Sequence, residues 1–445
     1  MQTHYTGGVG WAGSPTCDNA ASGRHESMKT PVLEDFERRG LIADVTTPAE
    51  LGAHLAGGTR TIYVGFDPTA DSLHVGSLVP LLALRRIQLA GHRPIVLVGG
   101  GTGLIGDPAG KTGERALNAG EQVAAWADRL KAQVRPFLDF DRGPHAAILV
   151  DNYQWLSRLE LIPFLRDIGK HFSVGAMIAR ESVRARLGAG ISYTEFSYQV
   201  LQAYDFLALH ERHGCTVQMG GSDQWGNITA GTELIRRMRG AAAYGLTMPL
   251  VVKSDGTKFG KTEAGTIWID PARTSAYEMY QFWLNTADAD VGRFLKYFTF
   301  LNPTEIDELV RQARAAPEKR AAQRALAAEV TRLVHGEEAQ REAERAGQRA
   351  FDDDVSWVLE TEGGVPSSVL PASEAPRPIW RVLKDAGIVP STSEARRLIQ
   401  QGGIEVNRRR VQSLDETLVA GRYAVKVGKR RVYRVIIEAQ GASEK

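Results

Sequence analysis

Residues 62–77 read IYVGFDPTADSLHVGS and contain the most informative pattern for the fold. The first five residues predict a buried β-strand, and a helical pattern begins near His74 and continues to Ala90. Backbone N–H groups at the start of such a helix favour anionic phosphate, and Gly76 lets a flat ligand approach the backbone. His74 and Thr69 can donate hydrogen bonds to phosphate oxygens. A histidine at a helix start is, however, more often a cap or a surface residue.

Strand and helix patterns alternate from Thr61 to about Lys253. Besides residues 62–66, strands are predicted at 94–98, 147–150 and 216–219. This alternation predicts an α/β fold, a parallel sheet with helices on both faces. Ligands bind such sheets at the carboxyl ends of the strands, where most of the polar clusters fall.

The remainder of the chain divides by composition. Residues 302–350 have a charged helical pattern, and the following stretch is rich in Pro, Gly and Ser, as linkers are. Residues 380–445 contain 14 Lys and Arg against 7 Asp and Glu, a net charge of +7 in a chain of net charge +2. This basic end favours a phosphate-rich partner, although a solvated basic surface is the bland alternative.

Other compositional features exclude some classes of protein. The two cysteines, Cys17 and Cys215, are too few for a four-cysteine zinc site or a disulfide framework, and they fit a reducing compartment. No apolar run approaches the roughly 18 residues of a membrane span, so no membrane association is expected. Residues 1–29 lack the patterns of signal and transit peptides, and we expect them to be a disordered extension.

A second motif is Lys258-Phe259-Gly260-Lys261-Thr262. Two lysines on a glycine-bearing loop make a cationic clamp suited to a leaving pyrophosphate. Lysine pairs are common on surfaces, so this motif alone is a weak signal.

The two motifs together resemble the His-x-Gly-His and Lys-Met-Ser-Lys-Ser signatures of class I aminoacyl-tRNA synthetases. With residues 65–74, 99–107 and 220–228, the chain looks like the bacterial tyrosyl-tRNA synthetase family from about residue 30 to its end. Ser77 departs from the family, which usually has a second histidine there, and this predicts a weakened nucleotide contact. Phe259 and Gly260 depart only from the class-wide consensus.

The resemblance implies a domain order and a fold for each part. The expected domains are the extension 1–29, a Rossmann-like catalytic domain with a helical insertion at 30–260, an α-helical anticodon-side domain at 261–350, a linker at 351–379 and a small α+β RNA-binding domain at 380–445.

The expected tyrosine pocket rests partly on helical spacing. Tyr198, Gln202 and Asp205 are four and three residues apart in a helix predicted at 194–210, which places them on one face; a wet helix face is the alternative. The resemblance assigns the ammonium group to Tyr198 and Gln202 and the phenol hydroxyl to Asp205 and Tyr63. It adds Asp107 and Gln224 to the amino-acid shell.

The resemblance also implies the remaining roles. The catalytic residues are Thr69, His74, Lys258, Lys261 and Thr262. The ATP-binding residues are Asp67, Gly76, Ser77, Gly221, Asp223 and Lys261. The tRNA-binding residues are Arg236, Arg237, Arg396, Arg397, Arg408 and Arg409.

The implied reaction is the activation of L-tyrosine by ATP with Mg²⁺ and the transfer of tyrosine to tRNA. The implied setting is a cytoplasmic homodimer without a resident cofactor or metal, with tRNA spanning both subunits. Two alternatives stay open: a tryptophanyl-tRNA synthetase-like enzyme, and a non-catalytic RNA-binding or splicing factor of the same shape.

Overall fold

The computed structural model describes most of the chain. The described residues are 30–109, 118–180, 183–184, 187–188, 190–254, 256, 259–262, 265–349, 357–360, 365–371, 376–428 and 431–438. The expected disordered extension and Lys258 therefore lie outside the described residues. Within them, no helix is long and apolar enough to cross a membrane.

A six-stranded sheet forms the centre of the catalytic domain, in the order β1-β6-β5-β2-β3-β4. Its strands are β1 (Asp44–Val45), β2 (Thr61–Phe66), β3 (Arg93–Val98), β4 (Ile148–Asp151), β5 (Cys215–Gly221) and β6 (Tyr244–Met248). Strands β2 to β6 run parallel, and only the edge strand β1 is antiparallel. The predicted parallel sheet is confirmed.

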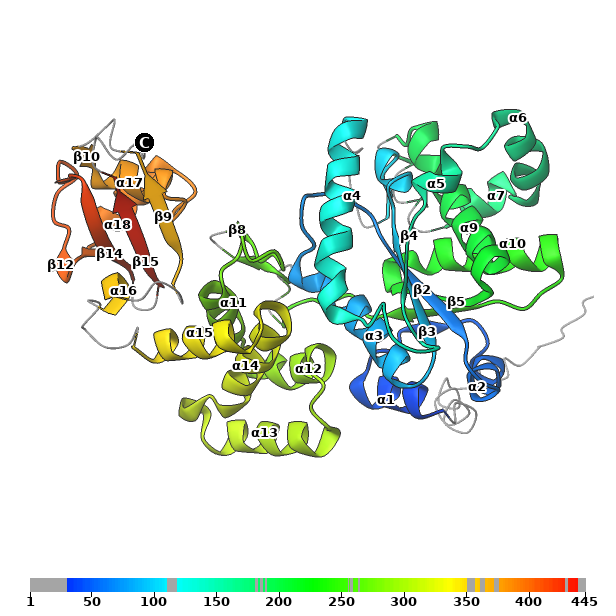
Figure 1. Ribbon diagram of the computed structural model, residues 1–445, viewed down its shortest axis with the longest axis horizontal. Helices are drawn as coiled ribbons and strands as arrows, with labels where there is room; N and C mark the ends of the chain where they lie inside the picture. Colours follow the sequence, from blue (N-terminus) through cyan, green and yellow to red (C-terminus); the bar gives the residue numbers. More distant parts are fainter. Residues whose placement is uncertain are drawn as a thin grey trace, which may run out of the picture.

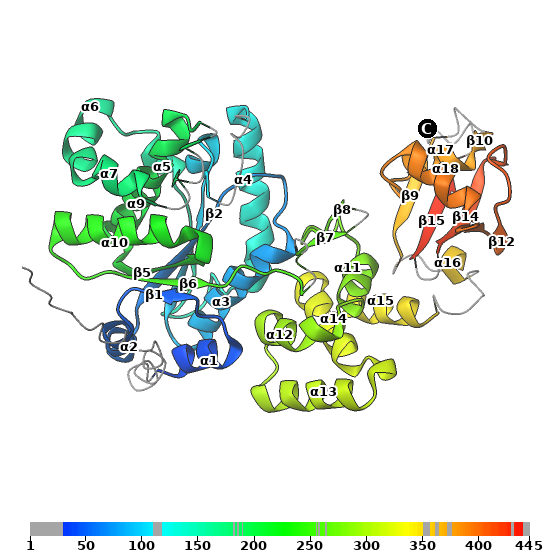
Figure 2. The same ribbon diagram turned by 180° about the vertical axis from the view of Figure 1, so that it is seen from behind.

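Helices cover both faces of this sheet, as Figures 1 and 2 show. Alternate residues of β2 point to opposite faces, as a strand requires. Ile62 and Val64 join the core beneath α3 (Leu78–Leu89). Tyr63 instead joins the core formed with α9 (Tyr193–His213) and α10 (Trp225–Arg239). Helix α4 (Gly120–Val134) also packs on the α3 face, through Leu130.

The strand order reverses beside β2. The chain passes from β2 to β3 and β4 on one side, and then continues at β5 on the other side of β2. The carboxyl ends of β2 and β5 therefore diverge into helices of opposite faces, and a crevice opens between them. The site described below lies there.

A helical insertion follows β4, as predicted. It contains α5 (Tyr153–Leu156), α6 (Leu161–Pro163), a π-helical turn (Phe164–Ile168) and α7 (Val174–Ile178). Its large apolar side chains are unusually exposed, at 67% for Leu161, 71% for Ile162 and 59% for Val174.

The next part is helical. It contains α11 (Ala276–Leu284), α12 (Asp288–Phe298), α13 (Pro303–Ala315), α14 (Ala321–His335) and α15 (Glu337–Arg349). Capping boxes at Ser275 and Asn302 begin α11 and α13 by satisfying their first backbone N–H groups. The N-terminal α1 (Pro31–Arg39) packs on it, and α2 (Pro48–Ala56) precedes β2.

The C-terminal part is a second α+β unit, shown at the end of the molecule opposite the catalytic domain in Figure 1. Its sheet has the order β12-β11-β14-β15-β9. The elements are α16 (Trp357–Glu360), β9 (Ser367–Leu370), β10 (Arg377–Pro378), α17 (Ile379–Asp385), α18 (Thr392–Gln400), β11 (Ile404–Val406), β12 (Arg409–Arg410), β13 (Thr417–Leu418), β14 (Gly421–Val427) and β15 (Arg431–Ile437). Strand β9 falls within the stretch predicted as a linker and pairs in parallel with β15.

Candidate active site

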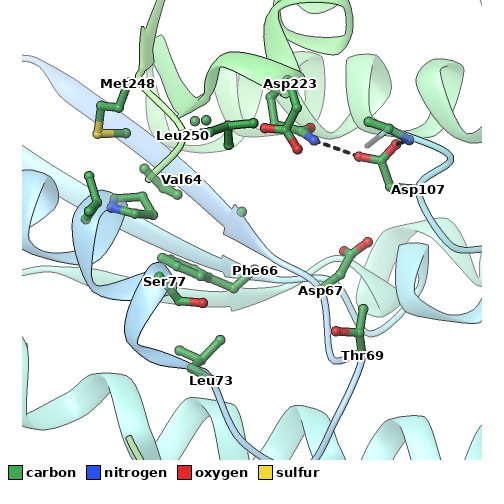
Figure 3. Close-up of a pocket in the computed structure, with 18 of the residues that line it drawn as sticks. Val64, Phe66, Asp67, Thr69, Leu73, Ser77, Asp107, Asp223, Met248 and Leu250 are labelled. Atoms are coloured by element: carbon green, nitrogen blue, oxygen red, sulfur yellow. Dashed lines mark hydrogen bonds between the residues drawn. The ribbon is translucent and has the colours of Figure 1, made fainter. Parts of the chain in front are cut away.

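A cavity of about 690 Å³ opens at the carboxyl ends of β2 and β5, within the roughly 300–1,000 Å³ of small-molecule sites. Figure 3 shows Asp67, Thr69 and Ser77 on one side of this space and Asp107 and Asp223 on the other. The structure gathers thirteen predicted residues around it: Tyr63, Asp67, Thr69, His74, Gly76, Ser77, Asp107, Tyr198, Gln202, Asp205, Gly221, Asp223 and Gln224.

Asp205 lies at the floor of the cavity and is only 2% exposed. Its two carboxylate oxygens accept hydrogen bonds from Asn152 Nδ2 at 2.8 Å and Trp155 Nε1 at 2.7 Å. Burial nevertheless raises the pKa of Asp205 to about 8, because these two neutral donors offset only part of the lost hydration. A further donor from a ligand would favour the charged form.

Tyr63 also lies at the floor, with its ring tilted against Phe206 at 5.3 Å between centroids. Its hydroxyl is buried and has no hydrogen-bond partner among the described residues. Burial and the nearby Asp205 raise the pKa of Tyr63 well above its usual value, so the phenol stays protonated. A buried unpaired hydroxyl costs about 1–3 kcal/mol, and this cost ends if a ligand supplies the missing hydrogen bond.

A network of amide and carboxyl groups forms one wall. Gln224 Nε2 donates to Asp107 Oδ2 at 2.7 Å, and Gln202 Nε2 donates to Gln224 Oε1 at 3.2 Å. Asn227 Nδ2 lies within 3.2 Å of both Gln202 Oε1 and Gln224 Oε1. The wall can accept hydrogen bonds from a cationic group such as a substrate ammonium.

Asp67 holds two other side chains at the end of β2. Its carboxylate accepts hydrogen bonds from Thr102 Oγ1 and Tyr198 Oη, both at 2.7 Å. Gly99 makes this approach possible, because a Cβ there would lie 1.9 Å from Asp67 Oδ1. Asp67, expected at ATP, thus also positions Tyr198, which was expected at tyrosine.

His74 lies at the mouth of the cavity and is exposed. Its Nδ1 accepts a hydrogen bond from the backbone N–H of Gly76 at 3.0 Å, so a neutral ring carries its proton on Nε2. Both readings of this histidine therefore apply: it caps a 3₁₀ turn (Val75–Ser77) and it presents a donor to the cavity. The α-helix begins only at Leu78, four residues later than predicted.

The two motifs are joined by backbone contacts through Ile267. Its carbonyl accepts from Val75 N–H at 3.1 Å, and its N–H donates to Gly260 O at 2.8 Å. The backbone of β7 (Lys261–Thr262) pairs with β8 (Gly265–Thr266). The backbone of the lysine motif is therefore held beside His74 at Gly260. The structure does not describe the two lysine side chains.

The cavity is acidic. The carboxyl groups of Asp67, Asp107, Asp205 and Asp223 line it, Asp205 being largely protonated at pH 7, and no Lys or Arg is among its described lining residues. Burial, with Asp107 nearby, raises the pKa of Asp223. Nowhere in the described parts of the chain do three His, Cys, Asp or Glu side chains gather as a metal site would require.

The predicted RNA-binding arginines lie outside the cavity. Arg236 and Arg237, on α10, both pair with Glu233, and the hydrogen bond from Arg236 lowers the pKa of that carboxyl to about 2. Arg396 on α18 stacks over Trp380 at 4.3 Å from the ring centroid.

The other C-terminal arginines lie nearby on the same unit. Arg397 pairs with Glu394 on α18. At the β11–β12 hairpin, Arg408 adopts φ 70° and Arg409 pairs with Glu416.

Four residues that hydrogen-bond to the predicted ones were not predicted from the sequence: Asn152, Trp155, Thr102 and Asn227. Gln218 was not predicted either, and its buried Oε1 has no partner among the described residues. One signal was available for Asn152, because it lies two residues after the strand predicted at 147–150, at the ligand-binding edge of the sheet.

Comparison with known proteins identifies relatives of the chain. Residues 56–352 match the family of tRNA synthetases class I (W and Y), and residues 377–421 match the S4 domain. The chain is 54% identical over 416 residues to a tyrosine–tRNA ligase of Bacillus caldotenax, which covers 91% of this chain and 99% of the relative. It is 51% identical over 414 residues to that of Aliivibrio fischeri (strain MJ11), covering 90% and 97%.

Solved structures with the same fold include two kinds of synthetase. A C-terminally truncated mitochondrial tyrosyl-tRNA synthetase of Aspergillus nidulans superposes with a TM-score of 0.66 at 31% identity, covering 72% of this chain and 94% of that one. A Plasmodium falciparum tryptophanyl-tRNA synthetase gives 0.51 at 12% identity, covering 70% and 84%, a likeness of fold alone.

Proposed function

The chain belongs to the bacterial tyrosyl-tRNA synthetase family of class I aminoacyl-tRNA synthetases, and from this membership we infer that it joins tyrosine to tRNA. Like its family, it uses ATP as a substrate. For the individual residues we propose the following roles.

The residues at the floor of the cavity would determine which amino acid binds. The phenol hydroxyl of tyrosine would donate to the Asp205 carboxylate and accept from the unpartnered Tyr63 hydroxyl. Phenylalanine would leave the Tyr63 hydroxyl unpartnered and Asp205 with only its bonds from Asn152 and Trp155, and such a loss gives strong discrimination. The indole of tryptophan is larger and has no hydroxyl to place between them. This arrangement is the single observation that favours tyrosine.

The polar wall would bind the rest of the amino acid. Tyr198, Gln202 and Asp107 would accept hydrogen bonds from the ammonium group, while Gln224 would contact the carboxyl side. The acidic cavity supports this placement, since a cation is attracted there. The substrate carboxylate would then point toward His74 and the mouth.

ATP would bind between the two motifs. Asp223 and Gly221 would contact the ribose, with Ser77 and Asp67 near the nucleotide and Gly76 leaving room for it. Because the described lining has no Lys or Arg, the triphosphate needs cations from elsewhere, and Lys258 and Lys261 are the ones that we propose. Mg²⁺ would arrive with ATP as part of that substrate.

The proposed first step is an in-line attack of the tyrosine carboxylate on the α-phosphorus. A carboxylate oxygen bonds to phosphorus as the bond to the bridging oxygen breaks, giving tyrosyl-adenylate and pyrophosphate. Thr69, His74 Nε2–H, the two lysines and Thr262 would stabilise charge on the departing pyrophosphate. A hydroxyl of the terminal tRNA adenosine then attacks the tyrosyl carbonyl and releases AMP.

The tRNA would be held by basic residues of two regions. Arg236 and Arg237 on α10 would meet the acceptor arm. Arg396, Arg397, Arg408 and Arg409 would bind phosphates through the S4 domain.

We propose a homodimer assembled through the helical insertion. The support is its exposed apolar surface, with Leu161, Ile162, Leu165, Val174 and Ile178 all at least 38% exposed, since such patches mark interaction sites. Ile162→Asp should yield monomers by light scattering. We place the enzyme in the cytoplasm, where its substrates occur.

Amino-acid-dependent ATP–pyrophosphate exchange tests the proposal. Tyrosine should support exchange and tryptophan should not. His74→Ala should lower kcat at least tenfold with little change in the KM for tyrosine. His213→Ala is the control, because His213 ends α9 at the edge of the sheet away from the cavity. Exchange supported by tryptophan, or an unchanged kcat in His74→Ala, would refute the proposal.

A further inference from the structure

The segment that leads into the lysine motif is held by α12. The carboxylate of Asp290 accepts hydrogen bonds from both Ser254 N–H and Ser254 Oγ at 3.0 Å. Arg293, one turn further along α12, donates to the carbonyl of Val252 and to Asp290 Oδ1, both at 2.6 Å. Three hydrogen bonds thus join one helix to residues 252–254, a few positions before Lys258, and a fourth links Arg293 to Asp290 within the helix.

The carboxylate at the centre of these contacts is buried. The side chain of Asp290 is 4% exposed, whereas Ser254 and Arg293 lie at the surface. A buried carboxylate is costly unless charged or hydrogen-bonding partners surround it. Two of its partners come from the loop, so displacement of residues 252–254 would leave the charge under-satisfied. The contact therefore favours one position of the segment.

The same helix also holds the motif itself. Phe259 stacks on Phe298 at 5.3 Å and meets Phe294 edge-on at 5.0 Å between ring centroids, and both belong to α12. It also contacts Phe282 and Trp283 of α11. Residues 252–254 and Phe259, which precede and follow position 258 in the sequence, are thus both held by the helical domain.

We propose that Asp290 is a positioning residue for adenylate formation: through Ser254 and Arg293 it fixes the segment that carries the pyrophosphate-binding lysines. Asp290 does not touch substrate and acts through the loop. This inference rests on the role proposed above for Lys258 and Lys261.

A merely structural role for Asp290 makes a different prediction. Asp290 lies in the first turn of α12, where a negative charge stabilises any helix. Asp288 lies in the same turn and pairs with Gln323 rather than with the loop. Asp288→Asn therefore removes a comparable helix-end charge and leaves residues 252–254 untouched.

The test measures tyrosyl-adenylate formation in single turnovers, with tyrosine binding measured separately. Asp290→Asn should slow the step about tenfold or more, the effect of one charge-assisted hydrogen bond, with tyrosine affinity unchanged and Asp288→Asn near the wild-type rate. Ser254→Ala should slow adenylate formation in the same way, whereas Ser254→Thr, which keeps the hydroxyl, should have a rate near that of the wild type. In the double variant Asp290→Asn/Ser254→Ala the losses should not add.

The Ser254 pair decides the question even if Asp290→Asn does not fold, because Ser254 is exposed. Equal rates in Ser254→Ala and wild type, or equal slowing by Asp288→Asn and Asp290→Asn, would overturn the proposal. Lys258→Ala and Lys261→Ala are run in parallel. If both keep the wild-type rate, the proposed function of the lysines fails as well; if they are slow while the Ser254 variants are not, only the positioning role of Asp290 fails.

Discussion

Replacing Tyr63 by phenylalanine should change stability and selectivity in opposite directions. The substitution removes only the hydroxyl and keeps the ring that packs on Phe206. In the unliganded protein this hydroxyl is buried without a partner among the described residues. Its removal should therefore relieve part of a cost of about 1–3 kcal/mol, and we expect Tyr63→Phe to raise the free energy of unfolding by about 1 kcal/mol.

The effect on catalysis should be unfavourable. A neutral hydrogen bond contributes about 0.5–1.5 kcal/mol, which corresponds to a loss of about 2–13-fold in kcat/KM for tyrosine. Phenylalanine cannot make this bond, so its kcat/KM should stay the same and the preference for tyrosine should fall by the same factor.

Two measurements check this prediction. Urea unfolding of the unliganded protein gives the stability change, and ATP–pyrophosphate exchange with each amino acid gives the selectivity. Tyr204→Phe is the control, since Tyr204 lies on α9 but contacts Phe164 rather than the cavity. If Tyr63→Phe left the selectivity unaltered, or made the protein less stable than wild type, the Tyr63 hydroxyl would not be an unpaired group that binds the substrate.

Three further predictions follow from the same geometry. Gly99→Ala should abolish exchange in a protein that still unfolds cooperatively, because the added Cβ would lie 1.9 Å from Asp67 Oδ1 and displace the carboxylate. Full activity would contradict the role of that carboxylate. The kcat/KM for tyrosine should rise with pH through the pKa of about 8 of Asp205, since only the ionised carboxylate accepts a hydrogen bond from the phenol at both oxygens without holding a proton of its own. The kcat/KM for phenylalanine, which has the same ammonium group, should not show this rise. Trp155→Phe should move the rise to higher pH, because it removes a hydrogen-bond donor to the carboxylate. A rise that Trp155→Phe does not move, or that phenylalanine also shows, would argue against Asp205. Removal of residues 351–445 should spare exchange and impair tRNA charging, and equal loss of both would count against an RNA-binding role for that part.

Local sequence pattern was sufficient for four of the six strands of the main sheet, without β1 and β6, and for one face of α9. Alternating apolar segments located β2 to β5, and the spacing of Tyr198, Gln202 and Asp205 placed them together at the cavity. These features depend on periodicity within one element, which a single sequence displays directly.

Features that depend on distant pairing were missed. Strand β9 lies in a Pro- and Ser-rich stretch, and only its pairing with β15, more than sixty residues later, makes it a strand. Asn152 and Trp155 reach Asp205 across 53 and 50 residues. No periodicity marks such contacts, because they arise when strands and helices from separate parts of the chain converge on one crevice.

A crystal structure with bound tyrosine would show which groups the phenol contacts. We expect the phenol oxygen at about 2.5–3.0 Å, hydrogen-bond distance, from both the Asp205 carboxylate and the Tyr63 hydroxyl. A tyrosine whose ring lies elsewhere, with Asp205 still bound only by Asn152 and Trp155, would contradict it.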